Sequence, residues 1–325
     1  MRGPRQAIAL HLRTEAPVPS KRAIGQDRWV RIVSLLPSAT EIVYLLGLGD
    51  DLVGVTHECD WPAHARSKRR VSYSNLASDA APAEIDRLVS ESMDGGAPTH
   101  GLDRDAIREL APDLVLTQDL CAVCAVPAGH LRSALDALGI DAEVVSLEPS
   151  SLEDVLGNIL TIGKATDTGQ RADEVVDDLR RRLDRVREAV AGATRPRTFA
   201  LEWGDPPYNG GHWVPEMIEL AGGEALLASR GVPSIRITWE EIADTDPEVV
   251  VFMPCGYDLE AASAEAVGLL GRPELAGARA VYAVAANSFF SRPGPRLVDG
   301  VEALASVLHE DRALPAKPEA IVRMR

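Results

Sequence analysis

A proline-free stretch near the middle of the chain most constrains the fold. Residues 151–191 carry apolar side chains at helical spacing, first Leu152, Val155 and Ile159 and later Val175 and Leu179. At 1.5 Å per residue an unbroken helix of this length would span roughly 60 Å, about twice the diameter of a small domain. The pattern therefore predicts a long helix that ties two lobes together. A break near Gly169 into two helices is the alternative.

Strand-like and helix-like segments alternate on both sides of this stretch. Apolar runs predict strands at 31–36, 51–56, 71–73, 114–117 and 143–147, and again at 197–203, 249–253 and 280–284. Helices are expected between them, the first at 39–46 with Ser38 as its N-cap. Strands alternating with helices indicate parallel βαβ units. The prediction is an α/β fold of two Rossmann-like lobes joined by a long backbone helix. Its expected parts are a disordered leader (1–28), an N-terminal lobe (29–150), the connecting helix (151–192) and a C-terminal lobe (193–325).

The two halves also share a short motif. Pro112-Asp113 precedes the apolar run at 114–117, and Pro247-Glu248 precedes the run at 249–253. The repeat supports two lobes of similar build and is too widely spaced for a solenoid.

Composition narrows the partners. Of the 325 residues 46% are hydrophobic, as in packed globular proteins, and the net charge is -15. A chain this acidic is a poor partner for nucleic acid or for an anionic membrane surface. The sequence contains no apolar run of the roughly 18 residues that a membrane span needs. Because residues 1–27 do not form a secretory signal, a cytoplasmic location is expected.

Scarce reactive and aromatic side chains follow the predicted strands. In an open α/β sheet, the loops beyond the carboxyl ends of the strands line the ligand crevice. We therefore expect these segments to converge on one pocket for a large, flat or metal-containing ligand. The candidates are His57, Glu58, Cys59, Trp61, Cys121, Cys124, Trp203, Tyr208, His212, Trp213, Cys255, Tyr257, Phe289, Phe290 and Arg292.

The cysteines raise the question of a metal site. Cys121-x-x-Cys124 has the spacing of a redox pair or of half a zinc site. Residues that could complete such a site in space are Cys59, His212, His57 and Cys255, the first two being the expected ligands. The alternative is that these cysteines are buried or structural. Nearby, Gly210-Gly211 either lets the backbone approach a ligand closely or forms a plain turn.

Several quoted segments together resemble a known family. They are Arg31-Ile-Val-Ser-Leu-Leu-Pro-Ser-Ala-Thr-Glu41, Val53-Gly-Val-Thr-His-Glu-Cys-Asp60, the Pro112 segment, Gly211-His-Trp-Val-Pro-Glu216 with Ala221-Gly-Gly223, and Arg292-Pro-Gly-Pro-Arg296. From Arg31 to about Leu308 the chain is similar to the cobalamin-binding branch of the substrate-binding proteins of class III metal-chelate ABC importers.

The resemblance implies a bilobed, non-enzymatic binding protein that holds cobalamin, another corrinoid or a related metal-tetrapyrrole in the cleft between its lobes. It adds Pro37 and Ser38 to the expected contacts, and it implies an ABC importer as partner. A thiolate or imidazole could coordinate the cobalt axially. Two alternatives remain: a protein that binds a transition metal or metal chelate through cysteine and histidine, and a thiol-dependent enzyme that handles a corrinoid. No Ser-His-Asp order, nucleophile elbow or P-loop favours an enzyme.

Overall fold

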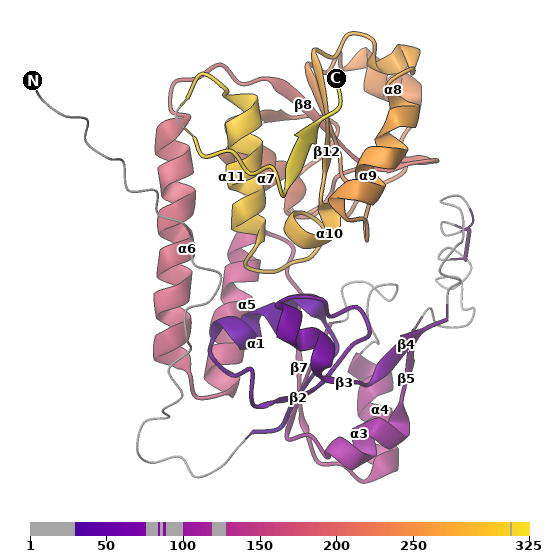
Figure 1. The fold of residues 1–325 in the computed structure, drawn as a ribbon, viewed down its shortest axis with the longest axis vertical. Helices are drawn as coiled ribbons and strands as arrows, with labels where there is room; N and C mark the ends of the chain where they lie inside the picture. The colour runs from indigo at the N-terminus through magenta and orange to yellow at the C-terminus, as the bar shows by residue number, and fades with distance from the viewer. Residues whose placement is uncertain (1–29, 76–83, 85–86, 89–99, 119–127, 313) are drawn as a thin grey trace, which may run out of the picture.

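The computed structural model describes residues 30–75, 84, 87–88, 100–118, 128–312 and 314–325. The leader expected at 1–28 lies outside these residues. The described chain forms two α/β lobes with a pair of helices beside them (Figure 1). This arrangement confirms the predicted fold class.

The N-terminal lobe is built on a five-stranded parallel sheet in the order β3-β2-β1-β6-β7. Its central strands are short aliphatic runs that are buried, as expected when helices cover a parallel sheet. A separate pair, β4 and β5, is antiparallel. The elements are β1 (Ile32–Ser34), α1 (Pro37–Leu45), β2 (Leu52–Val55), η1 (Ala63–Ser67), β3 (Arg69–Arg70), β4 (Ser72–Ser74), β5 (His100–Leu102), α3 (Arg104–Leu110), β6 (Leu114–Thr117), α4 (Ala128–Leu138) and β7 (Glu143–Ser146).

The C-terminal lobe holds a six-stranded sheet in the order β10-β8-β11-β12-β13, with β9 paired to β8. Strands β10, β8, β11 and β12 are parallel, whereas β13 and β9 run antiparallel to their neighbours. The elements are β8 (Arg197–Gly204), β9 (Pro207–Asn209), α7 (Val214–Leu220), β10 (Glu224–Ala225), α8 (Trp239–Asp244), β11 (Val249–Phe252), α9 (Leu259–Ala266), η2 (Val267–Leu269), η3 (Pro273–Leu275), β12 (Ala280–Val284), α10 (Ala286–Phe289), α11 (Leu297–Leu308) and β13 (Ile321–Arg323).

The segment between the lobes is two helices, so the single helix expected over 151–192 is wrong. Helix α5 (Leu152–Ala165) ends at Thr166, and α6 (Gly169–Ala189) begins three residues later and packs against α5. The pair approaches so closely at Gly163 that a Cβ there would lie 2.4 Å from the Cβ of Ala172. Helix α6 runs beside both lobes (Figure 1).

Two helix starts show how local chemistry sets these boundaries. Ser151 and Asp154 form a reciprocal capping box at the start of α5, and the Glu216 carboxylate from α7 accepts a hydrogen bond from the Leu152 N–H at 2.9 Å. The expected Ser38 cap is wrong: α1 starts two residues earlier, with Leu36 as N-cap and Pro37 in its first turn. Proline suits that position because its missing N–H would be unpaired there anyway.

The repeated Pro-Asp and Pro-Glu motifs make the same type of hydrogen bond in each lobe. The Asp113 carboxylate accepts the backbone N–H of Arg31 at 2.9 Å, which ties the start of β6 to the start of β1. The Glu248 carboxylate accepts the backbone N–H of Arg197 at 2.9 Å, which ties β11 to β8. The motif therefore sets the register of the two central strands in both sheets.

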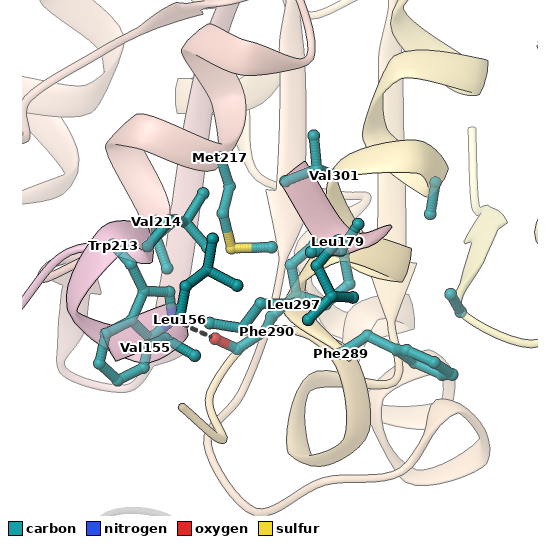
Figure 2. Close-up of a cluster of buried hydrophobic side chains, with 14 of the residues drawn as sticks. Val155, Leu156, Leu179, Trp213, Val214, Met217, Phe289, Phe290, Leu297 and Val301 are labelled. Atoms are coloured by element: carbon teal, nitrogen blue, oxygen red, sulfur yellow. Dashed lines mark hydrogen bonds between the residues drawn. The ribbon is translucent and has the colours of Figure 1, made fainter. Parts of the chain in front are cut away.

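One hydrophobic core extends from the N-terminal lobe through α5 and α6 into the C-terminal lobe. Figure 2 shows Val155 and Leu156 of α5 and Leu179 of α6 against side chains of the C-terminal lobe, among them Met217 and Phe290. Because the same core crosses the boundary, the lobes are held in a defined relative orientation. Within the described ranges, no helix is both long and apolar enough to cross a bilayer.

Candidate functional site

A cavity of about 140 Å³ lies between the lobes. Gln118, which directly follows β6, lines it from the N-terminal lobe. The loops after β11 and α10 and the segment that enters α7 supply most of the other side, so the carboxyl ends of both sheets meet here. The lining residues of the C-terminal lobe are Glu202, Gly211, His212, Trp213, Val214, Met253, Cys255, Phe290, Ser291 and Pro293.

Trp213 forms a fixed wall of this cavity. Its side chain is buried, and its indole Nε1–H donates a hydrogen bond of 2.7 Å to the carbonyl oxygen of Phe290 (Figure 2). The Phe290 side chain is fully buried. A buried indole N–H that is satisfied by backbone holds its ring in one position.

His212 lies beside this wall in a constrained backbone conformation. Its φ is +53°, a region that residues other than glycine rarely adopt, and two hydrogen bonds hold it: its N–H donates to Val232 at 2.6 Å, and its carbonyl accepts from Gly231 at 2.9 Å. Burial lowers the pKa of the imidazole. At neutral pH the ring is therefore neutral and has a nitrogen lone pair free to coordinate a metal.

The glycine pair before His212 approaches its own chain rather than a ligand. A Cβ on Gly211 would lie 2.2 Å from the backbone nitrogen of Ser234, so only glycine fits. The Gly211 N–H donates to the Ser234 hydroxyl at 3.1 Å, and that hydroxyl donates to Glu202. The glycines thus let the segment that leads into His212 pack against the backbone at Ser234.

A buried ion cluster joins the lobes next to the cavity. The Arg292 guanidinium donates from Nη1 to Glu41 at 2.7 Å and to Asp60 at 2.8 Å, both in the N-terminal lobe. The Arg292 and Glu41 side chains are only 4% and 3% exposed. Burial raises the pKa of Glu41, whereas Arg292 and Arg296 oppose that rise. Arg292 was predicted from the sequence as a ligand contact. In the structure its guanidinium donates to carboxylates of the protein itself, and contact with a ligand stays a prediction.

Two further predicted contacts meet across the same boundary. The Arg296 guanidinium lies 4.7 Å from the ring centre of Trp61 and 4.3 Å from that of Phe289. Such cation–π contacts contribute about 0.5–1 kcal/mol at exposed sites. Ser38 is also close to this region, since a Cβ on Gly294 would lie 3.5 Å from the Ser38 Cβ, and Pro37 directly precedes Ser38 at the start of α1.

Three predicted aromatic contacts lie elsewhere in the C-terminal lobe. The rings of Trp203 and Tyr257 meet edge to face with centres 5.8 Å apart, and Arg236 lies over the Tyr208 ring at 5.8 Å. Burial and the nearby Glu265 raise the pKa of Tyr257 to about 12, so the phenol stays protonated. None of the three lines the cavity described above. The candidate segments therefore do not all converge on it.

The cysteines occupy different environments. Cys59 is buried in the core with its Sγ 3.0 Å from the Thr40 hydroxyl, and burial raises the pKa of its thiol to about 12. A metal binds the thiolate, which such a pKa disfavours at neutral pH. Cys255 is exposed and lines the cavity. Cys121 and Cys124 lie outside the described residues. Among the residues described, Cys59 and His212 do not share a metal-ligand group.

The sequence analysis did not identify several residues that line the cavity, nor Glu41 of the buried ion cluster. Gln118, Met253 and Ser291 carried no signal that separates them from ordinary loop residues. Glu41 did carry one: it is the only charged residue between Arg31 and Asp50, in a stretch that the apolar pattern places in the core. A carboxylate in such a position must find a buried partner, and Arg292 is that partner.

Comparison with known proteins now places the chain. Residues 32–284 match the family described as periplasmic binding protein. The chain belongs to this family. The vitamin B12-binding protein of Yersinia pestis (strain Pestoides F) is 26% identical over 275 residues, which cover 82% of each chain.

Solved structures of this kind share the fold. The periplasmic vitamin B12-binding protein of Vibrio cholerae is 25% identical with a TM-score of 0.58, covering 86% of this chain and 96% of its own. A periplasmic heme-binding protein from Pseudomonas aeruginosa is 23% identical with a TM-score of 0.66, covering 89% and 96%. Similar proteins thus carry different ligands, and ligand identity has to be argued from the site.

Proposed function

We propose that the chain binds a corrinoid such as cobalamin between its lobes. The observation that carries the proposal is His212, a half-buried neutral imidazole held beside Trp213 and Phe290 in a cavity that both lobes line. Aromatic walls suit a flat macrocycle, and an imidazole suits an axial position on its metal. The names of the vitamin B12-binding relatives support the same ligand class.

The size of the cavity limits how the ligand enters. At about 140 Å³ it is smaller than the roughly 300–1,000 Å³ of pockets that enclose a drug-sized ligand. A corrinoid therefore places only one edge in the space described here. Residues 119–127, which follow Gln118 in the chain, lie outside the described residues.

Titration with hydroxocobalamin tests the proposal. We expect one corrinoid per chain and a shifted visible cobalt band, because imidazole replaces the axial water. In His212→Gln the shift should be lost and the affinity should fall by about tenfold or more, equivalent to about 1.4 kcal/mol. His64→Ala is the matched control, since His64 is an exposed histidine of η1. Haemin bound in preference to the corrinoid, or no binding of either, would contradict the proposal.

Transport is the role that follows from this ligand. The chain binds and releases its ligand without turnover, and it delivers the ligand to an ABC importer. The thiol-enzyme alternative requires turnover of the corrinoid that is lost when Cys121 and Cys124 are replaced by serine. For a binding protein we expect no turnover in the parent, and corrinoid binding that the same replacement leaves intact.

Location is part of the proposal. A receptor that delivers to an importer meets its ligand outside the cytoplasm, and the comparisons give the expected cytoplasmic location no support. Cell fractionation with detection of the native chain decides between the two. Recovery of the chain in the cytoplasmic fraction would contradict a role in import and favour corrinoid handling inside the cell.

A further inference from the structure

A second group of metal-ligand side chains lies in the N-terminal lobe, outside the cavity described above. His57 and Glu58 follow β2, and His100 begins β5. Nε2 of His57 lies 4.0 Å from Oε1 of Glu58, and the two imidazole centres are 5.2 Å apart. One ligand atom from each of the three side chains lies within 4.8 Å of the others. Chain segments more than 40 residues apart are thus brought to one point by β4 and β5.

Hydrogen bonds orient His57 for this arrangement. Ser72 of β4 donates its hydroxyl proton to Thr56 at 2.8 Å, so its oxygen is left to accept from Nδ1–H of His57 at 2.9 Å. The His57 backbone N–H donates to the same oxygen at 3.2 Å. This pattern puts the ring proton on Nδ1 and leaves the Nε2 lone pair facing Glu58. Metal-bound histidines are oriented in the same way, by a hydrogen bond from the other ring nitrogen.

His100 supplies an independent observation. Its Nδ1 is buried and has no hydrogen-bond partner among the described residues. Leaving a buried polar atom unpaired lowers stability, so such an atom indicates a ligand site. The carboxylate of Glu58 is about half exposed. Closing the 4.0 Å separation to the spacing of two ligands at about 2.0–2.2 Å from zinc needs only a small side-chain rotation.

We propose that His57, Glu58 and His100 bind a divalent transition-metal ion, with zinc as the expected occupant. Two imidazoles and one carboxylate form an established zinc ligand set that leaves a fourth position for water. Burial lowers the pKa of His57, as do His100 and Arg70, whereas Glu58 raises it. The site is separate from the proposed corrinoid site and does not depend on it.

Metal binding to the full chain tests this site. After removal of metal by chelation, calorimetric titration with zinc chloride should show one site per chain. His57→Ala, His100→Ala and Glu58→Gln should each weaken zinc binding by at least about tenfold, and Ser72→Ala by about 10–100-fold because it releases the orienting hydrogen bond. His64→Ala should bind as the parent does. Circular dichroism establishes that each variant is folded, and Glu58→Gln, a surface change, keeps the test valid if a histidine variant is not.

Cobalt(II) separates this site from one made of cysteines. Bound to His57, Glu58 and His100, cobalt(II) should give visible ligand-field bands without a near-ultraviolet thiolate charge-transfer band. A thiolate band that disappears when Cys121 and Cys124 are replaced by serine would overturn the proposal. Unchanged zinc affinity in His57→Ala and His100→Ala, or absence of zinc binding to the parent, would overturn it as well. Corrinoid titration of the same samples is read separately, so the two proposals fail independently.

Discussion

Arg292→Ala is expected to lower the free energy of unfolding by about 3–5 kcal/mol. The substitution leaves the Glu41 carboxylate, 3% exposed, without the guanidinium that now donates to it at 2.7 Å. It also removes the link from Arg292 to Asp60 that joins the lobes. Urea unfolding followed by far-ultraviolet circular dichroism measures the loss.

The cost of Arg292→Ala should depend on pH. Burial already raises the pKa of Glu41 above its ordinary value of 4.5, and removing Arg292 takes away the main opposing charge. An acid with a raised folded-state pKa is stabilising below its unfolded pKa, and that contribution is lost as pH rises through the folded-state pKa. In Arg292→Ala the difference between the folded-state and unfolded-state pKa of Glu41 is wider than in the parent. The loss in free energy of unfolding should therefore be largest at neutral pH and smaller in mild acid, where Glu41 becomes protonated.

Two controls separate the buried cluster from ordinary ion pairs. Arg180→Ala removes an exposed pair with Glu153 and should cost at most about 1 kcal/mol. The double variant Glu41→Leu with Arg292→Met removes both charges and should recover much of the loss. A single-variant loss below about 1 kcal/mol, or one that grows in acid, would show that the cluster does not hold the lobes as described.

Phe290→Ala is the second change with a large expected effect, about 3–5 kcal/mol less stability. The Phe290 side chain is fully buried in the core shared by both lobes, beside Leu297 and Leu156 (Figure 2). Its removal leaves a cavity next to Trp213, which keeps its hydrogen bond to the residue 290 carbonyl. Urea unfolding again gives the loss, and the same variant should bind hydroxocobalamin more weakly because one wall of the site is gone.

Val267→Ala is the matched control for Phe290→Ala, because Val267 is 61% exposed. Its effect should stay within about 0.5 kcal/mol. Parent-like stability of Phe290→Ala would mean that this region collapses around the lost ring or is not packed as Figure 2 shows.

Local patterns predicted most of the fold. Buried strands such as β6 and β11 were visible because aliphatic runs are bounded by Pro-Asp and Pro-Glu. The break between α5 and α6 was only an alternative, since Thr166 and Asp167 are tolerated within helices and tertiary packing decided the matter. Helix periodicity cannot show that α6 folds back on α5.

The site was less accessible to sequence reasoning because it depends on distant pairs. Arg292 reaches Glu41 across 251 positions, and His57 meets His100 only through the pairing of β4 with β5. The residue types indicated which side chains could belong to a site, but the sequence did not show which distant residues they contact. Thus His212, Trp213, Cys255 and Phe290 do line one cavity, whereas Cys59 packs in the core.

Corrinoid binding between the lobes is tested most directly by locating the cobalt in crystals grown with hydroxocobalamin, from anomalous scattering at the cobalt edge. We expect one strong peak between the lobes, within coordination distance of the His212 imidazole, with the corrin ring against the walls formed by Trp213 and Phe290. A cobalt peak outside the interlobe region, or crystals that take up no corrinoid at saturating concentration, would contradict it.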